Sequence, residues 1–377
     1  MRDRFKRFNS GRAVLFLVAL IALFMTGAVI KITAVVILPF TIALLLALVL
    51  TPVVNFLGKI KIPRFVSILL VVIMIITGLS AMGAILFTSV RSILSVYPRY
   101  ENRITIIYLW LGNFFELPYD EHLSIIQNLW AQLNIRNQIQ QYTLALTNAS
   151  LSFLMDAVLV TVFMVFLLIE GIFIKEKISV AFEKKWEGHI RRISTDIIIQ
   201  ISHYLSIKFI ISLGTGAIVF VLLSVIGVQF AALWGIMQFV LNFIPTIGSI
   251  VIGVVVSLFA LIQFWPDPGP VIWTVTIMFG VNFLVGNVLE PKIMGDRLGL
   301  SPIAILFSLV VWGWMWGFAG MIIAVPLMAI IKIVCGNISV LEPVSILLSS
   351  RHAVLAKKAA YEKEAENEKA APEITEK

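Results

Sequence analysis

The sequence predicts an all-α, polytopic membrane protein: a bundle of about eight transmembrane helices, with broken or re-entrant helices in its C-terminal half. Of 377 residues, 60% are hydrophobic and 13% are charged, against about 25% charged in an ordinary soluble domain. The apolar residues form unbroken runs of about 20, the length a helix needs to cross a bilayer, whereas barrel strands alternate over about 10 residues. The basic residues gather beside these runs, as in cytoplasmic loops of membrane proteins.

The N-terminal part begins with a basic segment, residues 1–12, which the positive-inside rule places in the cytoplasm. The apolar run that follows is too long for a signal-peptide core and has no small-residue cleavage site, so we expect it to be a retained span. Residues 13–90 then hold the first three transmembrane helices, expected at 13–30, 32–57 and 65–90.

Residues 91–150 carry four basic and four acidic residues, with apolar positions at helical spacing. We expect an extracytoplasmic insert of amphipathic helices, packed as a lid on the membrane face or folded as a separate ligand-binding domain. Residues 151–174 predict the fourth transmembrane helix. Residues 175–204 contain six basic residues and predict a charged cytoplasmic connector, solvated at the headgroups and without a nucleic-acid partner.

Residues 205–345 predict a C-terminal transmembrane core, and residues 346–377 a charged cytoplasmic tail. Within the core, two apolar stretches, 231–262 and 303–335, each exceed the ~20 residues of a single crossing. The first is interrupted around Pro245, and the second by glycines and Pro326, so both should bend or unwind partway.

The topology of the core has two alternatives. If each long stretch crosses once, there are eight crossings, with Lys292 and Arg297 outside and the lysine-free loop 263–270 inside. If each stretch is a re-entrant hairpin, these loops exchange sides while both termini remain cytoplasmic. The charge rule favours the hairpins.

No constellation of an enzyme is present. The four histidines are scattered, no phosphate-binding glycine loop occurs, and Cys335 is the single cysteine. We therefore predict no catalytic residue, no metal site and no cofactor.

Polar residues within the apolar core are the candidates for a solute or ion pathway, because such groups are costly in hydrocarbon and turn toward a cavity or an interface. Gln238 and Asn242 share one helix face, and Asn282, Gly286 and Glu290 share another, with Gly286 allowing close approach. The alternative role of the amides is to join helices to one another. Glu290 is the candidate for a proton or cation site, or an ordinary interfacial carboxylate.

Three motifs in order carry a family resemblance: Asn242 to Gly248, Glu290 to Gly295 with Leu298 to Pro302, and Trp312 to Leu327. Across residues 13–345 the chain resembles the autoinducer-2 exporter family. The resemblance implies an oligomeric transporter of about eight helices without ATPase machinery. It is a family linked to export of autoinducer-2, with some members similar to sodium–proton antiporters. The complete set of pathway candidates is Gln238, Asn242, Pro245, Gly248, Asn282, Gly286, Glu290, Pro291, Gly295 and Pro326.

The leading hypothesis is a secondary transporter that moves a small solute across the inner membrane without ATP hydrolysis. The first alternative is a sodium(lithium)/proton antiporter in which Glu290 titrates, and the second is a non-transporting membrane scaffold. The expected partners are the lipid bilayer, a small-molecule or ion substrate and further copies of the chain.

Overall fold

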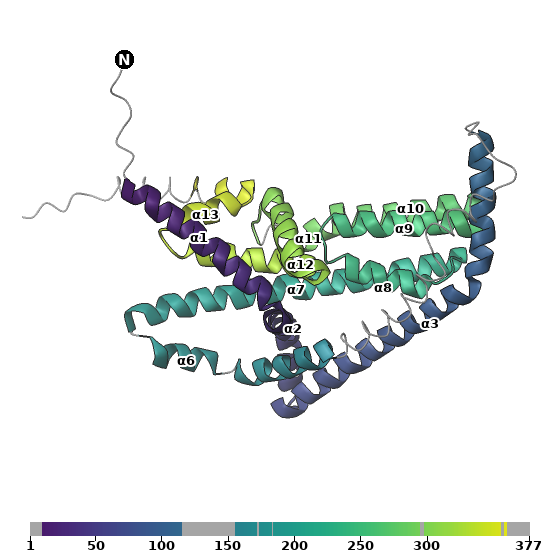
Figure 1. Ribbon diagram of the computed structural model, residues 1–377. Helices are drawn as coiled ribbons and strands as arrows, with labels where there is room; N and C mark the ends of the chain where they lie inside the picture. The colour runs from purple at the N-terminus through teal and green to yellow at the C-terminus, as the bar shows by residue number, and fades with distance from the viewer. Residues whose placement is uncertain are drawn as a thin grey trace, which may run out of the picture.

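The computed structural model describes residues 10–114, 155–171, 173–182, 184–294, 298–355 and 358–359. Within these ranges every regular element is helical, apart from a single isolated bridge, so the predicted all-α class is confirmed. Residues 155–170 form one helix. The other elements are α1 Ser10–Ile32, α2 Ala34–Lys59, α3 Arg64–Phe114, α6 Ile174–Ala181, α7 Lys184–Ile226, α8 Ala231–Leu241, α9 Ile247–Phe264, α10 Pro268–Leu284, the π-helical turn η1 Val285–Leu289, α11 Glu290–Met294, α12 Pro302–Gly336 and α13 Glu342–Leu348 (Figure 1).

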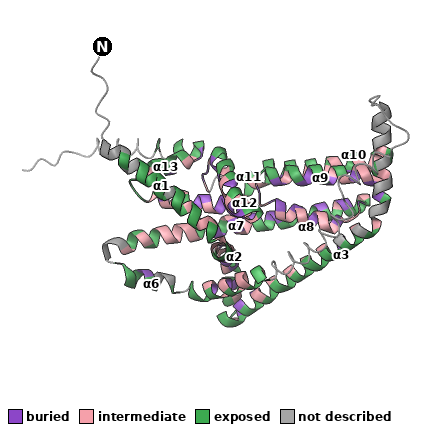
Figure 2. Ribbon diagram, in the orientation of Figure 1, coloured by how far each residue is buried: buried purple, intermediate pink, exposed green. Residues whose placement is uncertain are grey.

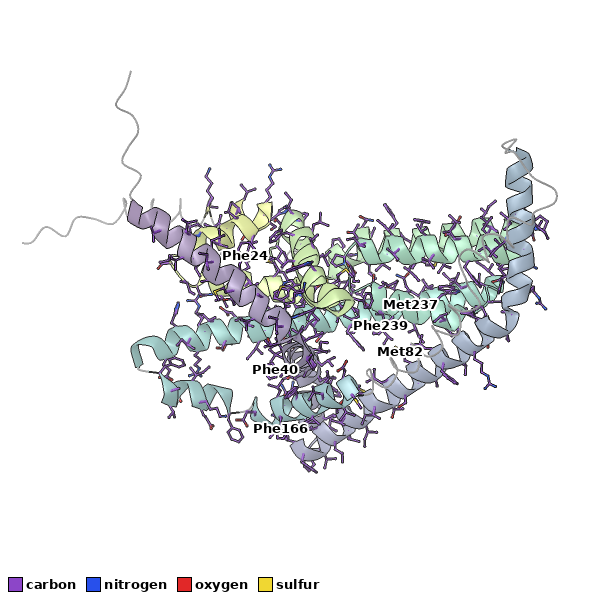
Figure 3. All side chains as sticks on the ribbon, viewed as in Figure 1. Phe24, Phe40, Met82, Phe166, Met237 and Phe239 are labelled. Atoms are coloured by element: carbon purple, nitrogen blue, oxygen red, sulfur yellow. The ribbon has the colours of Figure 1, made fainter. Side chains whose placement is uncertain are left out.

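The helices present apolar side chains on their outer surfaces. In the described part of the chain, six helical segments are long and apolar enough to cross a membrane, and α1 and α8 contribute shorter apolar segments. Phe24 on α1 and Phe166 are 72% and 66% exposed (Figure 3), and exposed positions are frequent on the coloured parts of α1 and α3 (Figure 2). Such surfaces are unfavourable in water and favourable against lipid, as a polytopic membrane protein requires.

Two helices continue through boundaries that the sequence suggested. Helix α3 extends past residue 90 to Phe114, so the expected insert begins as a continuation of the third span, and residues 115–150 lie outside the described ranges. Helix α7 joins most of the connector to the fifth span in one element of 43 residues. It contains no proline, so nothing in it removes a backbone donor and interrupts the helix.

The first long apolar stretch is a hairpin of α8 and α9. The chain turns at residues 242–246, where Thr246 has φ 60°. At the open end, Gln263 accepts a hydrogen bond from Gln229 N and donates one to Gly227 O, both at 2.8 Å, so the start of α8 and the end of α9 lie together. The two ends of this stretch are therefore on the same side of the bundle.

The second long stretch also doubles back, within α12. A straight helix would separate Ser308 from Ala324 by about 24 Å, from 16 residues at ~1.5 Å each. Instead, Ser308 Oγ donates a 2.8 Å hydrogen bond to Ala324 O. The turn is at Trp316 and Gly317, whose φ of 62° is accessible to glycine. Residues 302–316 and 317–336 thus form a second hairpin.

The place of this break corrects one expectation. Gly317 lies at the turn, as the sequence suggested, but Pro326 lies inside the returning limb and is fully buried. The helical limb continues through Pro326, so the chain does not unwind at this proline.

Helix α7 lies at the centre of the arrangement. It packs against α2, α8, α10 and α12, and α7, α8, α9 and α10 run side by side (Figure 1). Buried side chains from α7, both hairpins and α10, among them Leu223, Ile252, Met278 and Ala324, form one apolar core. Lys208, near the middle of α7, is 3% exposed and so lies within the packed bundle.

Candidate functional site

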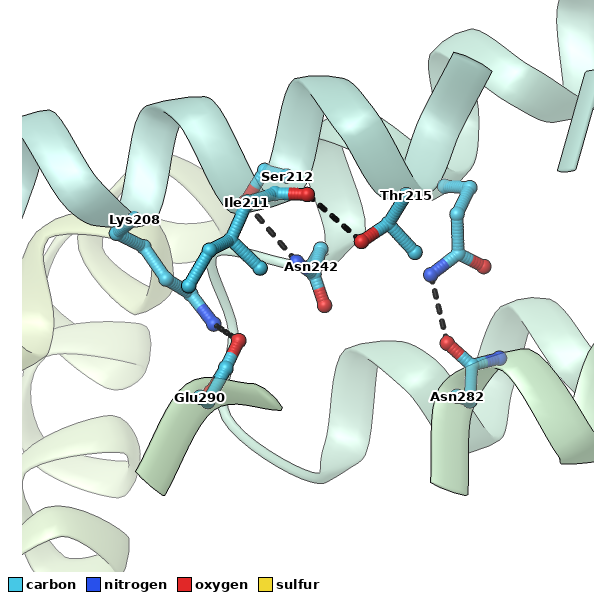
Figure 4. A network of polar contacts seen from close by, with 8 residues as sticks. Lys208, Ile211, Ser212, Thr215, Asn242, Asn282 and Glu290 are labelled. Atoms are coloured by element: carbon cyan, nitrogen blue, oxygen red, sulfur yellow. Dashed lines mark hydrogen bonds and ion pairs between the residues drawn. The ribbon is translucent and has the colours of Figure 1, made fainter. Parts of the chain in front are cut away.

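A buried ion pair joins α7 to α11. Lys208 Nζ contacts Glu290 Oε1, and their side chains are 4% and 23% exposed (Figure 4). The carboxylate is therefore the more accessible partner. A charge removed from water in this way is stable only with a partner of opposite sign, because an unpaired buried charge is strongly unfavourable.

The local helix geometry explains how Glu290 reaches Lys208. The backbone N–H of Glu290 donates to Val285 O, five residues earlier, which is the hydrogen bond of a π-turn. Such a turn holds one residue more than the corresponding α-turn and rotates the residues that follow it. Asn282, before the turn, faces α8, while Glu290, after it, faces α7.

A cavity of about 200 Å³ lies beside this ion pair. It has a polar side with Tyr204, Lys208 and Glu290 and a largely apolar wall from both hairpins and the loop before α12. The full set of lining residues is His203, Tyr204, Ile207, Lys208, Pro245, Glu290, Met294, Leu298, Gly299, Leu300, Ile305 and Val325. The cavity is lined mainly by α7, α11 and the loop before α12, and the two hairpins contribute Pro245, Ile305 and Val325.

The loop that closes the cavity is tied to the second hairpin. Lys332 Nζ donates to Leu298 O and to Gly299 O, each at 2.7 Å. On the other side of the loop, Ser350 N donates to Gly299 O at 2.7 Å. These hydrogen bonds fix the backbone at Leu298 and Gly299, shortly before α12.

A row of hydrogen-bonded amides continues from the ion pair into the core (Figure 4). Asn242 Nδ2 donates to Ser212 Oγ at 3.0 Å, and Gln238 Nε2 donates to Asn282 Oδ1 at 2.7 Å. Gln238 is fully buried, and its Oε1 has no hydrogen-bond partner in the described structure. An unpaired buried acceptor is unfavourable, so this oxygen is a point where a bound donor would stabilise the protein.

Several predicted candidates lie together in this region. Pro245 and Glu290 line the cavity, and Gln238, Asn242 and Asn282 form the amide row. Gly248 lies at the hairpin turn, where a Cβ would be 1.8 Å from Leu241 O. Its contribution is therefore to let the two limbs meet.

Other candidates lie elsewhere. Gly286 is exposed and a Cβ there would contact nothing within 4 Å, so the expected close approach at this glycine is wrong. Gly286 lies inside the π-turn, which rotates Glu290 away from the face of Asn282, so the three residues no longer share one face. Pro291 is exposed, Pro326 is next to the cavity residue Val325 inside a helical limb, and Gly295 lies outside the described residues.

Lys208 and Tyr204 are the residues that the sequence analysis missed. Lys208 is the single charged residue within the apolar run 205–227. A lone charge in such a run could have identified it as a candidate from the sequence. An ionisable residue inside a transmembrane segment is a candidate for function by default, with a partner to be found on another helix. Tyr204 is one turn earlier on the same face and carried no comparable signal.

The chain is similar to known proteins over most of its length. Residues 15–339 match the family described as AI-2E family transporter. The chain belongs to the AI-2E transporter family. A putative transport protein of Borreliella burgdorferi is 30% identical over 333 residues, covering 88% of this chain and 90% of its own length. One of Haemophilus influenzae is 32% identical over 337 residues, covering 86% and 92%. The AI-2 transport protein TqsA of Escherichia coli K12 is 28% identical over 352 residues, covering 90% and 96%.

Membership of the AI-2E transporter family makes the chain a multi-pass membrane transporter. The resemblance identified from the three motifs is thereby confirmed. The family match spans α1 to the end of α12 and so includes both hairpins, the ion pair and the cavity.

Proposed function

We propose that this AI-2E transporter moves a small polar solute across the inner membrane through the cavity beside Lys208 and Glu290, without ATP hydrolysis. The observation that carries the proposal is the buried ion pair beside a cavity to which both helical hairpins contribute residues. Hairpins that end at membrane depth are a device by which secondary transporters bind solutes, because their turns leave backbone polar groups free to interact. Relative movement of the hairpins would expose the cavity to either side in turn.

The proposed orientation has both termini in the cytoplasm and the loop between α9 and α10 outside. Tyr100 on α3 donates to Gln229 Oε1, and Gln229 contacts Gln263 near the end of α9, so this loop shares a side with the start of the proposed extracytoplasmic insert. Lys292 lies at the opposite end of α10–α11. This puts the lysine-free loop outside and the basic loop inside, in agreement with the charge rule.

Autoinducer-2 is the first solute to test, because TqsA bears the name of an AI-2 transport protein. Purified protein in proteoliposomes should transport the solute with the wild-type sequence and lose transport when Asn242, Pro245 or Glu290 is replaced singly. The control is Lys177→Met, which removes an exposed ion pair with Glu170. Normal flux in all three variants would contradict the assignment of the site.

A second candidate, sodium(lithium)/proton antiport, is favoured by the Glu290 carboxylate, which is partly open to the cavity and paired with a lysine. It predicts a sodium-driven pH change in the same proteoliposomes that Glu290→Gln abolishes. If neither solute flux nor pH change occurs for any substrate tested, the remaining role is that of a membrane scaffold. In that case deletion of the charged connector or tail, and not of the polar core residues, would remove the phenotype. Further copies of the chain are the proposed oligomeric partners.

A further inference from the structure

The resting charges of the cavity restrict the solute that it can accept. Lys208 and Glu290 neutralise each other, so the site has one positive and one negative group and no net charge. Among the described residues that line the cavity, Lys208 and Glu290 form the single ion pair. A charged solute that enters the cavity therefore interacts with two side chains that already pair with each other.

A solute with a single charge would give this partly buried site a net charge. An anion beside Lys208 would compete with Glu290 for it, and a cation beside Glu290 would compete with Lys208. Lys208 is almost fully buried, so a loss of its partner would be especially unfavourable. A solute that carries both charges avoids this cost, because its carboxylate can pair with Lys208 while its ammonium pairs with Glu290.

From this geometry we infer that the transported solute is a small zwitterion of the α-amino-acid type with an apolar side chain. This inference rests on the proposed function and specifies its substrate class. In an α-amino acid the two charged groups are bonded to the same carbon atom, which suits two protein charges that are in direct contact in the absence of solute. The solute enters by separating the pair slightly and occupying the space between its members.

The remaining walls of the cavity match the other parts of such a solute. Ile207, Ile305 and Val325 offer an apolar surface for a side chain, and Tyr204 adds a hydroxyl on the polar side. The volume of about 200 Å³ is below the ~300 Å³ at which pockets for drug-sized ligands begin, so it accommodates a small metabolite.

The test compares molecules that differ only in charge. L-Valine has both charged groups, valinamide retains only the ammonium, and 3-methylbutanoate retains only the carboxylate. With purified full-length protein, we expect labelled L-valine to bind in detergent and to enter proteoliposomes. We expect each singly charged analogue to compete about 100-fold more weakly, or worse, because a site built for a polar group strongly rejects an analogue that lacks it.

Variants separate a binding role of the ion pair from a structural one. Lys208→Met and Glu290→Gln should each abolish valine binding. The double variant Lys208→Gln/Glu290→Gln replaces both charges at once, leaves no unpaired charge and should retain a wild-type elution profile, while still failing to bind valine. The matched control is the double variant Lys177→Gln/Glu170→Gln, which neutralises an exposed ion pair away from the cavity and should bind valine normally.

Four results would overturn the inference. Equal competition by all three molecules would show that charge is not recognised, and preference for valinamide or 3-methylbutanoate would show a cation or an anion site. Normal valine binding by the neutral double variant would place the solute elsewhere. Absence of valine binding in protein that transports autoinducer-2 or sodium would reject the zwitterion and leave the proposed function intact, whereas failure of every flux would reject both.

Discussion

The side-chain amide of Gln238 donates a 2.7 Å hydrogen bond to Asn282 and so joins the first hairpin to α10 across the apolar core. Gln238 is fully buried, and Asn282 also donates to Ser249 O on α9 at 3.4 Å. The pair is therefore a polar contact among three helices, on the cavity-facing half of the bundle. Replacing only one of the two amide side chains would leave the other without this hydrogen-bond partner.

We expect Asn282→Leu to destabilise the protein more than the double variant Gln238→Leu/Asn282→Leu. An orphaned buried amide costs about 1–3 kcal/mol, whereas replacing both partners with apolar groups can be nearly neutral. The measurement is the apparent melting temperature of the detergent-solubilised protein. If the double variant lost as much melting temperature as Gln238→Leu and Asn282→Leu together, or more, the two side chains would not interact as described.

The ion pair gives a second stability prediction. Lys208→Met should lower the free energy of unfolding by about 3 kcal/mol, the low end of the range for breaking a buried pair, because Glu290 retains 23% exposure to solvent. Lys177→Met, whose partner Glu170 is exposed, should change the melting temperature little. Equal effects of the two substitutions would mean that Lys208 is not buried in the folded protein.

The two hairpin turns depend on glycine. A Cβ on Gly248 would lie 1.8 Å from Leu241 O, and a Cβ on Gly320 would lie 2.0 Å from Trp312 O. Both distances are far inside contact, so Gly248→Ala and Gly320→Ala should each reduce the yield of monodisperse protein and the flux. The control is Gly280→Ala, where a Cβ meets nothing within 4 Å. A well-behaved Gly248→Ala protein would contradict the closed turn.

The hairpin topology can be tested by labelling in intact cells. In a background with Cys335→Ala, a membrane-impermeant maleimide should label Asp267→Cys from outside and should label Lys292→Cys only after permeabilisation. Both positions are exposed and lie at opposite ends of α10–α11. The reverse pattern would support eight single crossings in place of the hairpins.

The contact between α3 and the first hairpin should be sensitive to pH. Burial raises the pKa of Tyr100, whose hydroxyl donates to Gln229. The folded state therefore favours the protonated phenol. Its contribution to stability is complete below the ordinary tyrosine pKa of about 10, and it is lost as the pH rises through the higher pKa of Tyr100 in the folded protein. Tyr100→Phe should lose about 0.5–1.5 kcal/mol of stability at neutral pH.

The measurement is the melting temperature of the wild type and of Tyr100→Phe at a series of pH values from pH 7 upward, and the quantity compared is the difference between the two proteins at each pH. We expect that difference to shrink in alkaline solution. A constant difference would mean that the hydroxyl makes no titrating contact with Gln229.

Much of the architecture could be predicted from the sequence. The unbroken apolar runs of about 20 residues predict membrane-spanning helices, and Pro245 and Gly317 were among the helix-weakening residues that indicated interruptions in the two long stretches. The amides at Gln238 and Asn242 were identifiable as unusual because polar groups at such positions are costly. The three motifs determined the family.

Other features depended on the tertiary structure. Sequence alone left hairpins and crossings open, because both bury the same apolar length; contacts between distant residues, such as Ser308 with Ala324 and Gln229 with Gln263, distinguish them. The π-turn that rotates Glu290 toward α7 and removes Gly286 from its face has no periodic signal in the sequence. The sequence by itself determined that the chain is a helical membrane protein with interrupted helices and isolated polar groups. Only the folded chain decided that Lys208 and Glu290, 82 residues apart, share one buried contact, because burial and pairing of charge are properties of the space between helices.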